Sequence, residues 1–244
     1  LAHKRNGVWS KELILWRYSV RKSPTSSRAL ANLGLAYLKI GRPEQAVPIL
    51  RRAVLADPSS SGQARSNLDF ALGLALAERG DHESAVVKYR KALELRKDDT
   101  RILSNLGGSL IHLGRYKEAV EELKKALTVD PNMMEANLNM GIALYYLKDY
   151  ETAIATLQRA IDLGIKSPYP HMYIGAILAS TGDIDAAEKH LRRAVDVDPT
   201  SYDALKNLGE ILIRKGKEEE GNQYIKRAEK FKKPPPNTSE ALNP

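Results

Sequence analysis

The sequence contains no cysteine, few aromatic residues other than tyrosine, and no long uninterrupted apolar run. The absence of cysteine excludes disulfides, cysteine-based zinc sites and thiol chemistry, and it leaves the redox compartment open. No apolar segment is long enough to cross a membrane as a helix, and none resembles a signal peptide. Because the chain starts at Leu1 rather than at methionine, we expect it to be a processed or excised piece of something longer.

The residue types that carry chemistry form no catalytic or metal-binding pattern. None of the histidines has metal-pair spacing; they are His3, His82, His112, His171 and His190. We expect His112 and His171 to pack between helices or to line a groove. Neighbouring carboxylates, such as those at 121–122 and 218–220, are interpreted as solvated helix surface. We therefore predict that this chain is not an enzyme and needs no cofactor or metal.

The net charge of +8 is concentrated at the two ends of the chain. Residues 1–22 carry +5 and residues 226–233 carry +4, whereas residues 23–225 sum to zero. Nucleic-acid binding normally requires a basic stripe along the contact surface, so we predict no nucleic-acid partner. The basic ends are interpreted as solubilising charge, with contact to a membrane surface or to an acidic partner as the alternative.

A pattern of two amphipathic helices recurs along the chain. It is clearest at residues 101–112 and 116–129, where apolar residues recur at three- and four-residue steps. One glycine recurs at 34-residue steps from Gly73 to Gly209, after a first step of 39 from Gly34. Alanines follow it by twelve residues, at Ala46, Ala85, Ala119, Ala153 and Ala187. One such hairpin cannot bury its apolar face alone, so the copies are expected to stack.

These residues resemble the tetratricopeptide repeat (TPR) family, whose helix-turn-helix unit is 34 residues long. The resemblance covers about residues 27–233. It implies an all-α fold, a right-handed superhelical solenoid of helix-turn-helix units. The six expected units are residues 27–60, 66–99, 100–133, 134–167, 168–201 and 202–235. Large apolar residues stand between the recurring small ones, at Leu50, Tyr89, Leu123, Leu157, Leu191 and Ile225.

Three segments depart from this regular pattern. The five extra residues of the first step lie at 58–65, where either a Ser/Gly loop bulges out or the next helix starts early. Their composition favours the loop. Residues 1–26 are predicted to be a half-repeat whose helix covers the first complete unit as a cap. Residues 234–244 begin with three prolines, which predicts an extended, disordered tail.

The N-terminal segment carries a second resemblance. Its residues are Arg5, Asn6, Trp9, Glu12, Leu15 and Trp16, followed by Ser23-Pro24 and Asn32-Leu33-Gly34. This arrangement is similar to the junction in multi-spanning membrane glycosyltransferases of the protein O-mannosyltransferase type. There the last membrane helix leads into a TPR tail outside the cytoplasm. The resemblance implies an extracytoplasmic location (periplasmic, lumenal or secreted), although a basic cluster beside a membrane helix usually favours the cytoplasmic side.

An asparagine recurs two residues before the shared glycine, at Asn32, Asn105, Asn139 and Asn207. In the TPR family this position belongs to the concave surface, which is lined by the first helix of each unit. An amide carries both a donor and an acceptor, so it can pair with the backbone of an extended peptide whatever its sequence. The alternative is a hydrogen bond from the asparagine to the neighbouring repeat.

An apolar and aromatic patch is expected on the same surface, because exposed apolar patches mark interaction sites and tyrosine supplies rigid contact area. Its members are Phe70, Leu74, Leu138, Ile142, Tyr145, Tyr146, Tyr169, Met172 and Tyr173. The alternative is that several of them pack between adjacent repeats. The carboxylate clamp of some TPR proteins requires basic and asparagine pairs on three consecutive units. Here Arg28, Asn32, Arg101 and Asn105 are isolated fragments of it, which disfavours a charged C-terminal ligand.

We predict a non-catalytic scaffold that binds a protein or an extended peptide in an uncharged, tyrosine-rich groove. One alternative is the tail of a membrane glycosyltransferase, which would present acceptor polypeptide to the membrane active site. In that case the membrane is contacted only through a missing upstream segment. Another alternative is a structural subunit that self-associates through its open solenoid ends.

Overall fold

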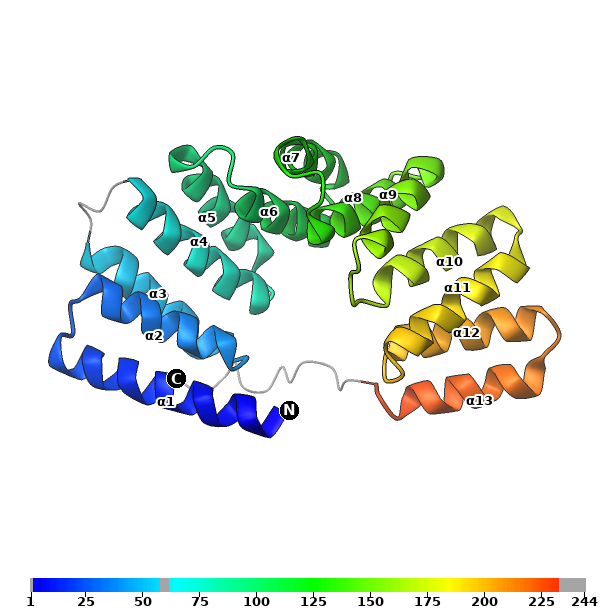
Figure 1. Cartoon of the computed structure of the whole chain (residues 1–244), viewed down its shortest axis with the longest axis horizontal. Helices are drawn as coiled ribbons and strands as arrows, with labels where there is room; N and C mark the ends of the chain where they lie inside the picture. The colour runs from blue at the N-terminus through cyan, green and yellow to red at the C-terminus, as the bar shows by residue number, and fades with distance from the viewer. Residues whose placement is uncertain (1, 58–61, 233–244) are drawn as a thin grey trace. The chain divides into compact units, whose positions relative to one another are not determined.

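The computed structural model describes residues 2–57 and 62–232, with side chains from residue 11 onward in those ranges (Figure 1). Over these residues the chain forms thirteen α-helices and no strand. This confirms the predicted all-α fold of consecutive helix hairpins. Among the helices described, none is both long enough and apolar enough to cross a membrane. The predicted tail at 234–244 lies outside the described residues.

The first compact unit, Leu1–Ala143, contains seven helices and the start of an eighth. They are α1 (Ala2–Lys22), α2 (Ser27–Lys39), α3 (Pro43–Ala56), α4 (Gly62–Glu78), α5 (His82–Leu95), α6 (Thr100–His112), α7 (Tyr116–Val129) and α8 (Met134–Tyr146). Helices α2, α4 and α6 each pack most extensively on the helix that follows them, and α1 packs on α2. The first helices α2, α4 and α6 also contact one another in succession.

The second compact unit, Leu144–Pro244, contains the end of α8 and five further helices. They are α9 (Tyr150–Asp162), α10 (Tyr169–Thr181), α11 (Ile184–Val197), α12 (Tyr202–Arg214) and α13 (Glu218–Glu229). Helix α10 pairs with α11 and α12 pairs with α13. Leu191 of α11 and Leu205 and Leu208 of α12 lie in one buried core that joins these hairpins.

The recurring glycines allow the two helices of each hairpin to approach closely. A Cβ added to Gly73 would lie 2.5 Å from the Cε1 atom of Tyr89, which is fully buried. The same glycine-to-large-residue contact joins Gly34 with Leu50, Gly107 with Leu123, Gly175 with Leu191 and Gly209 with Ile225. In these five hairpins the large apolar residue of the second helix packs on the glycine of the first, and a larger residue in place of the glycine would collide with it.

Helix starts and turns repeat as regularly as the packing. Several helices begin after a side chain that accepts a backbone N–H hydrogen bond, which satisfies a donor that the helix leaves unpaired. These caps are Ser26, Asp81, Asp99, Asp149, Asp183 and Ser201. Within most hairpins a glycine at positive φ reverses the chain, for example Gly114 at 72° and Gly182 at 95°. At the corresponding place between them lies Lys148, at φ 64°.

The first repeat boundary differs from the loop favoured by composition. Helix α4 starts at Gly62 and has 17 residues, whereas α2 and α6 have 13. The expectation of a loop was wrong for residues 62–65, and residues 58–61 lie outside the described part. Arg65 on the added turn donates to the buried Asp69 carboxylate at 3.0 Å and to the Val54 carbonyl at 3.4 Å. These contacts stabilise the early start of the helix.

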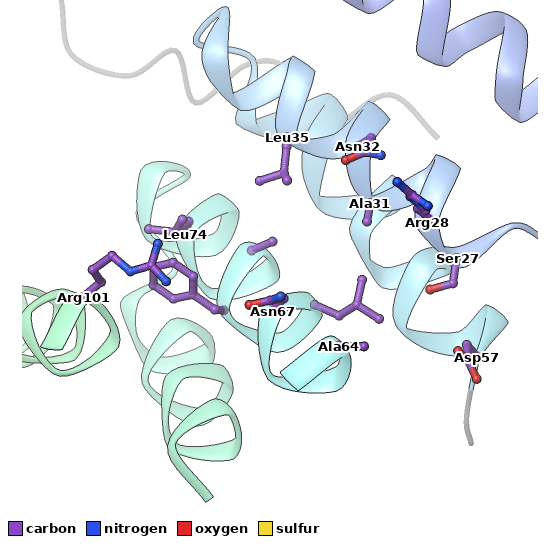
Figure 2. Close-up of a pocket in the computed structure, with 13 residues that line it drawn as sticks. Ser27, Arg28, Ala31, Asn32, Leu35, Asp57, Ala64, Asn67, Leu74 and Arg101 are labelled. Carbon is purple, nitrogen blue, oxygen red and sulfur yellow. The ribbon is translucent and has the colours of Figure 1, made fainter. Parts of the chain in front are cut away.

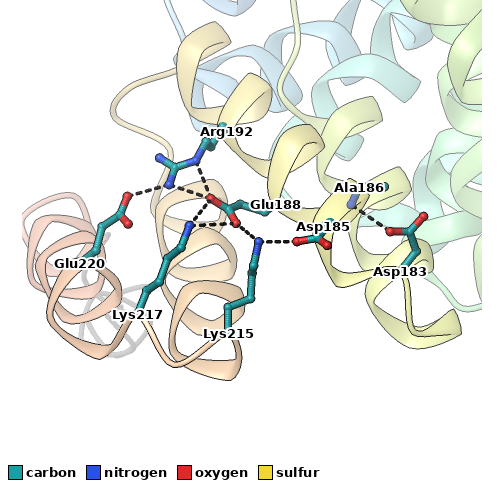
Figure 3. A network of polar contacts seen from close by, with 8 residues as sticks. All are labelled: Asp183, Asp185, Ala186, Glu188, Arg192, Lys215, Lys217 and Glu220. Carbon is teal, nitrogen blue, oxygen red and sulfur yellow. Dashed lines mark hydrogen bonds and ion pairs between the residues drawn. The ribbon is translucent and has the colours of Figure 1, made fainter.

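A network of charged side chains joins α11 to the chain from α12 to α13 (Figure 3). The Glu188 carboxylate, whose side chain is 10% exposed, accepts hydrogen bonds from Lys215, Arg192 and Lys217. Arg192 also donates to Glu220 at 2.6 Å. The hydrogen bond from Lys215 is the largest cause that lowers the pKa of Glu188, and those from Arg192 and Lys217 add to it. Together they bring the pKa to about 2, although burial acts in the opposite direction. The network therefore favours the ionised carboxylate at neutral pH.

Candidate functional site

A pocket of about 590 Å³ lies between the first helices of the first unit (Figure 2). We call it the α2/α4 pocket. Its lining residues are Ser27, Arg28, Ala31, Asn32 and Leu35 of α2, Asp57 at the end of α3, Ala64, Asn67, Leu68, Phe70, Ala71 and Leu74 of α4, and Arg101 of α6. Three of the residues predicted for binding therefore meet here, namely Asn32, Phe70 and Leu74. Leu35 completes the apolar floor and was not predicted.

The apolar floor is positioned by the core beneath it. The Phe70 ring packs on the Tyr89 ring, with 5.9 Å between the ring centroids. Tyr89 in turn packs on Gly73 and is fully buried. Leu35 and Leu74 are half-buried, so part of each side chain faces the pocket. The floor is thus a rigid extension of the hairpin core, with apolar area left open to a ligand.

The polar side chains of the pocket are only partly engaged. Across the described part of the chain, Arg28, Asn32 and Asn67 make no hydrogen bond or ion pair. The Arg101 guanidinium lies 6.0 Å from the centroid of the Phe70 ring. It also pairs with Asp99 at 3.4 Å. Two amides and a guanidinium around the pocket can therefore bind a ligand without first breaking an internal contact.

The other three predicted asparagines have different surroundings. The Asn105 amide donates to the Arg101 carbonyl of its own helix at 2.7 Å. The Asn139 amide donates to the Ser104 carbonyl of the preceding repeat at 3.3 Å, which is the inter-repeat bond considered as the alternative. Asn207, in the second unit, lines a separate pocket of about 300 Å³. Of the four asparagines, Asn32 is the one that lines the α2/α4 pocket.

Tyrosines form a ring cluster in the second unit. The ring centroid of Tyr145 lies 5.2 Å from that of Tyr146 and 5.1 Å from that of Tyr173. Burial is the largest cause that raises the pKa of the Tyr173 phenol, and the neighbouring Tyr146 adds to it. The phenol is protonated at neutral pH. Tyr146 and Tyr169 are 45% and 48% exposed. The cluster offers ring surface and hydroxyl groups to a partner.

The remaining predicted residues contribute less exposed surface. Met172 is 7% exposed and belongs to the core of the second unit with Leu191 and Leu205. This position leaves it little area to offer a ligand. Leu138 and Ile142 are half-buried residues of α8 in the first unit.

Two arrangements were missed by the sequence reasoning. Arg28 and Arg101, interpreted as isolated fragments, line the same pocket although they are two repeats apart. His171 and His190 face each other, with 3.2 Å between their Nδ1 atoms. Burial is the first cause that lowers the pKa of both imidazoles. The two histidines are 19 residues apart and lie on the two helices of one hairpin, so a comparison of facing positions within each hairpin would have found the pair.

Histidines also meet in the first unit, where the rings of His82 and His112 stack with 4.2 Å between their centroids. Throughout the described residues, no three side chains of histidine, aspartate or glutamate are grouped to hold a metal ion.

Comparison with known proteins identifies the repeat. Models described as tetratricopeptide repeat match residues 27–60, 98–166 and 175–236. A model described as TPR repeat matches residues 73–110.

One relative is named as a pilus assembly protein. The type IV pilus assembly protein PilF of Pseudomonas aeruginosa is 38% identical over 82 residues, which are 34% of this chain and 31% of that protein. The match thus spans about a third of the relative's length. A solved structure of Pseudomonas aeruginosa PilF covers 81% of this chain and 88% of its own, with a TM-score of 0.66 and 24% identity.

Other solved structures share the fold at lower identity. The Cut9–Hcn1 assembly of the APC/C covers 98% of this chain and 46% of that chain, with a TM-score of 0.80 and 17% identity. YrrB, described as a TPR protein with an unusual peptide-binding site, covers 78% of this chain and 95% of that chain, with a TM-score of 0.58 and 18% identity. Repeat models match residues 27–60, 73–166 and 175–236, and the helices have the same fold as known TPR solenoids, so the chain belongs to the tetratricopeptide repeat family.

Proposed function

We propose that this chain is a non-catalytic protein-interaction scaffold and that its α2/α4 pocket binds an extended peptide. One observation carries the proposal: the unengaged Asn32 amide lies beside an apolar floor made by Leu35, Phe70 and Leu74. An amide pairs with a peptide N–H and C=O whatever the peptide sequence. The floor supplies an anchor for one apolar side chain, which is the usual centre of binding energy in an interface.

The chemistry of the pocket supports binding rather than catalysis. Ser27 supplies the hydroxyl among the described lining residues, and it donates to the Ala53 carbonyl at 2.8 Å. The lining contains no histidine that would activate this hydroxyl as a general base. TPR proteins bind protein or peptide partners, and YrrB is described as having a peptide-binding site. A peptide ligand for the α2/α4 pocket agrees with that family role.

A second candidate function is self-association through α1. This helix exposes Ile14, Leu15 and Tyr18 by 66%, 56% and 54%. Three large apolar side chains on a terminal helix favour contact with another molecule. A second copy of the chain would cover them, and concentration-dependent mass in light scattering would detect it. An unchanged monomer mass would argue against this function.

The glycosyltransferase alternative is supported by the N-terminal residue pattern alone. It predicts a native polypeptide much larger than 27.1 kDa that resists salt extraction from membranes. Fractionation with an antibody to the repeats measures both properties. A salt-extractable product near 27.1 kDa would contradict it.

The peptide-binding proposal is tested with a library of fluorescent nine-residue peptides and the full chain. Asn32→Ala and Phe70→Ala are each expected to lower the affinity for the bound peptides by about fivefold or more, because about 1 kcal/mol of binding free energy is lost with a hydrogen bond or an anchor contact. Asn105→Ala is the matched control, since its amide already donates within α6. Circular dichroism checks that each variant folds. Equal affinities for all three variants would reject the pocket as the site.

A further inference from the structure

The proposed peptide groove continues beyond the α2/α4 pocket. Asn32, Leu35 and Leu74 also line an adjoining pocket of about 300 Å³. The shared residues make the two pockets parts of one groove along α2 and α4. The first part contains both guanidinium groups of the groove, Arg28 and Arg101, which lie on opposite sides of it (Figure 2).

Both arginines are available to an anionic ligand. Arg28 is exposed and has no partner in the part of the chain that the structure describes. Arg101 is 64% exposed, and its contact with Asp99 is long, at 3.4 Å. Arg96 pairs with the same carboxylate at 2.9 Å and compensates its charge. Asp57 is the acidic group of this pocket and lies toward Ser27 (Figure 2), so the two arginines leave a positive excess.

The adjoining pocket has an excess of negative charge. Its charged residues are Glu12, Lys39 and Glu78. Glu12 and Lys39 pair at 3.0 Å and together are neutral. Glu78 makes no ion pair within the described residues, so its charge is uncompensated. Burial raises the pKa of its carboxyl, which indicates that a basic group beside it would stabilise the charged form.

We propose that this groove selects an extended peptide in which an acidic, an apolar and a basic residue follow at about two-residue steps. The proposal rests on the peptide-binding function proposed above. The acidic residue pairs with Arg28 or Arg101, the apolar residue packs on Leu35 and Leu74, and the basic residue pairs with Glu78. From Arg28 to Lys39, α2 rises about 16 Å, which an extended peptide spans with about five residues at roughly 3.3 Å each.

The test uses nine-residue peptides, acetylated and amidated, with leucine at the centre and Ser/Gly flanks. Charge is varied at two positions, two residues before and two residues after the leucine. Two peptides carry Glu and Lys there, one in each order. The other three carry Gln, Glu or Lys at both positions. Fluorescence anisotropy with the full chain measures their affinities. One order of the Glu/Lys peptide is expected to bind most tightly, and each wrong charge to weaken binding about two- to fivefold, which is typical of exposed ion pairs.

Charge-swap variants separate recognition from a merely structural effect. Glu78→Lys is expected to make the doubly acidic peptide the preferred one, and Arg28→Glu the doubly basic one. Glu83→Lys is the matched control, because Glu83 is 71% exposed on the neighbouring helix and lines neither pocket. Its variant is expected to retain the wild-type order of preference.

The outcomes distinguish this inference from the function on which it rests. Equal affinity for all the peptides, together with a loss on Asn32→Ala, would overturn the charge selection and retain peptide binding at the pocket. Preferences that do not change in Glu78→Lys and Arg28→Glu would also overturn it. Absence of binding by every peptide would overturn both proposals.

Discussion

Gly107 lies directly against Leu123, since a Cβ added to this glycine would come within 2.5 Å of the Leu123 Cγ. The next residue in the same helix, Gly108, would place its Cβ 3.3 Å from the side-chain nitrogen of Asn139. Two adjacent glycines of α6 thus have opposite surroundings. One is required by the close approach of α6 to α7, and the other faces the end of a polar side chain that can shift.

Gly107→Ala is therefore expected to destabilise the chain by about 1–3 kcal/mol, because the added methyl group overpacks the α6–α7 contact. Gly108→Ala is the matched control. Its gain in helix propensity of about 1 kcal/mol offsets the small shift of Asn139, so little or no loss is expected. Urea denaturation followed by circular dichroism measures both. Equal destabilisation by the two alanines would contradict the role of the close approach.

Lys148 occupies the left-handed conformation that glycines adopt at the corresponding turns, with φ 64°. Lys148→Gly is expected to stabilise the chain by about 0.5–1 kcal/mol, because relief of side-chain strain exceeds the added entropy of the unfolded state. Gly114→Lys is the reciprocal control, since a Cβ at Gly114 (φ 72°) would meet nothing within 4 Å. It is expected to destabilise by a similar amount. The thermal unfolding midpoint measures both, and shifts of the same sign would contradict this explanation.

The ionised Glu188 carboxylate is expected to contribute stability that is lost in acid. Its folded pKa of about 2 is below the ordinary value of 4.5, so the stabilisation is complete above about pH 4.5 and is lost as the pH falls toward 2. Glu188→Gln is expected to cost up to about 3 kcal/mol at pH 7 and only a small part of that near pH 2. Asp196→Asn on the same helix is the control, because its pair with Arg193 is exposed and 3.5 Å long. If the difference in unfolding free energy between the wild type and Glu188→Gln did not change with pH, this explanation would be refuted.

The His171–His190 pair is expected to make stability depend on pH in a second range, near neutral pH. Burial and the neighbouring His190 lower the pKa of His171, so the folded state disfavours its protonation. Stability from this source is complete above the ordinary histidine pKa of 6.5 and declines as the pH falls below it. His171→Asn is expected to flatten the stability profile between pH 7 and 5, and NMR of the wild-type imidazole should show titration below the ordinary value. Titration at or above 6.5 would contradict the effect of burial.

The helices themselves follow from local sequence. Periodicity predicted helices at 101–112 and 116–129, and the structure contains α6 at Thr100–His112 and α7 at Tyr116–Val129. These boundaries are readable because each helix has one apolar face and the turn between them is marked by a glycine. The same reasoning was wrong at 62–65. There Ser/Gly composition favoured a loop, but contacts of Arg65 with Asp69 and Val54 extend α4.

The candidate site was only partly accessible to the same reasoning. Family positions identified Asn32, Phe70 and Leu74 of the α2/α4 pocket because each lies at a fixed offset from a recurring glycine. Leu35 was missed although it lies one residue after its glycine, as Leu74 does, and Asn67 was missed at the same offset as Arg28 and Arg101, which were assigned to separate fragments. The position of a side chain relative to another repeat depends on how the hairpins stack, which one period of sequence does not encode.

The sequence by itself determined that this chain is a succession of helix hairpins, because a buried apolar stripe and a glycine facing a large residue are local patterns that recur. Only the tertiary structure decided which side chains of different hairpins meet. It placed Arg28 and Arg101 around one pocket, and it brought Lys215 and Lys217 of the next hairpin to the Glu188 carboxylate. Those contacts depend on the three-dimensional packing of hairpins, including the early start of α4, and not on the spacing of residues within any one repeat.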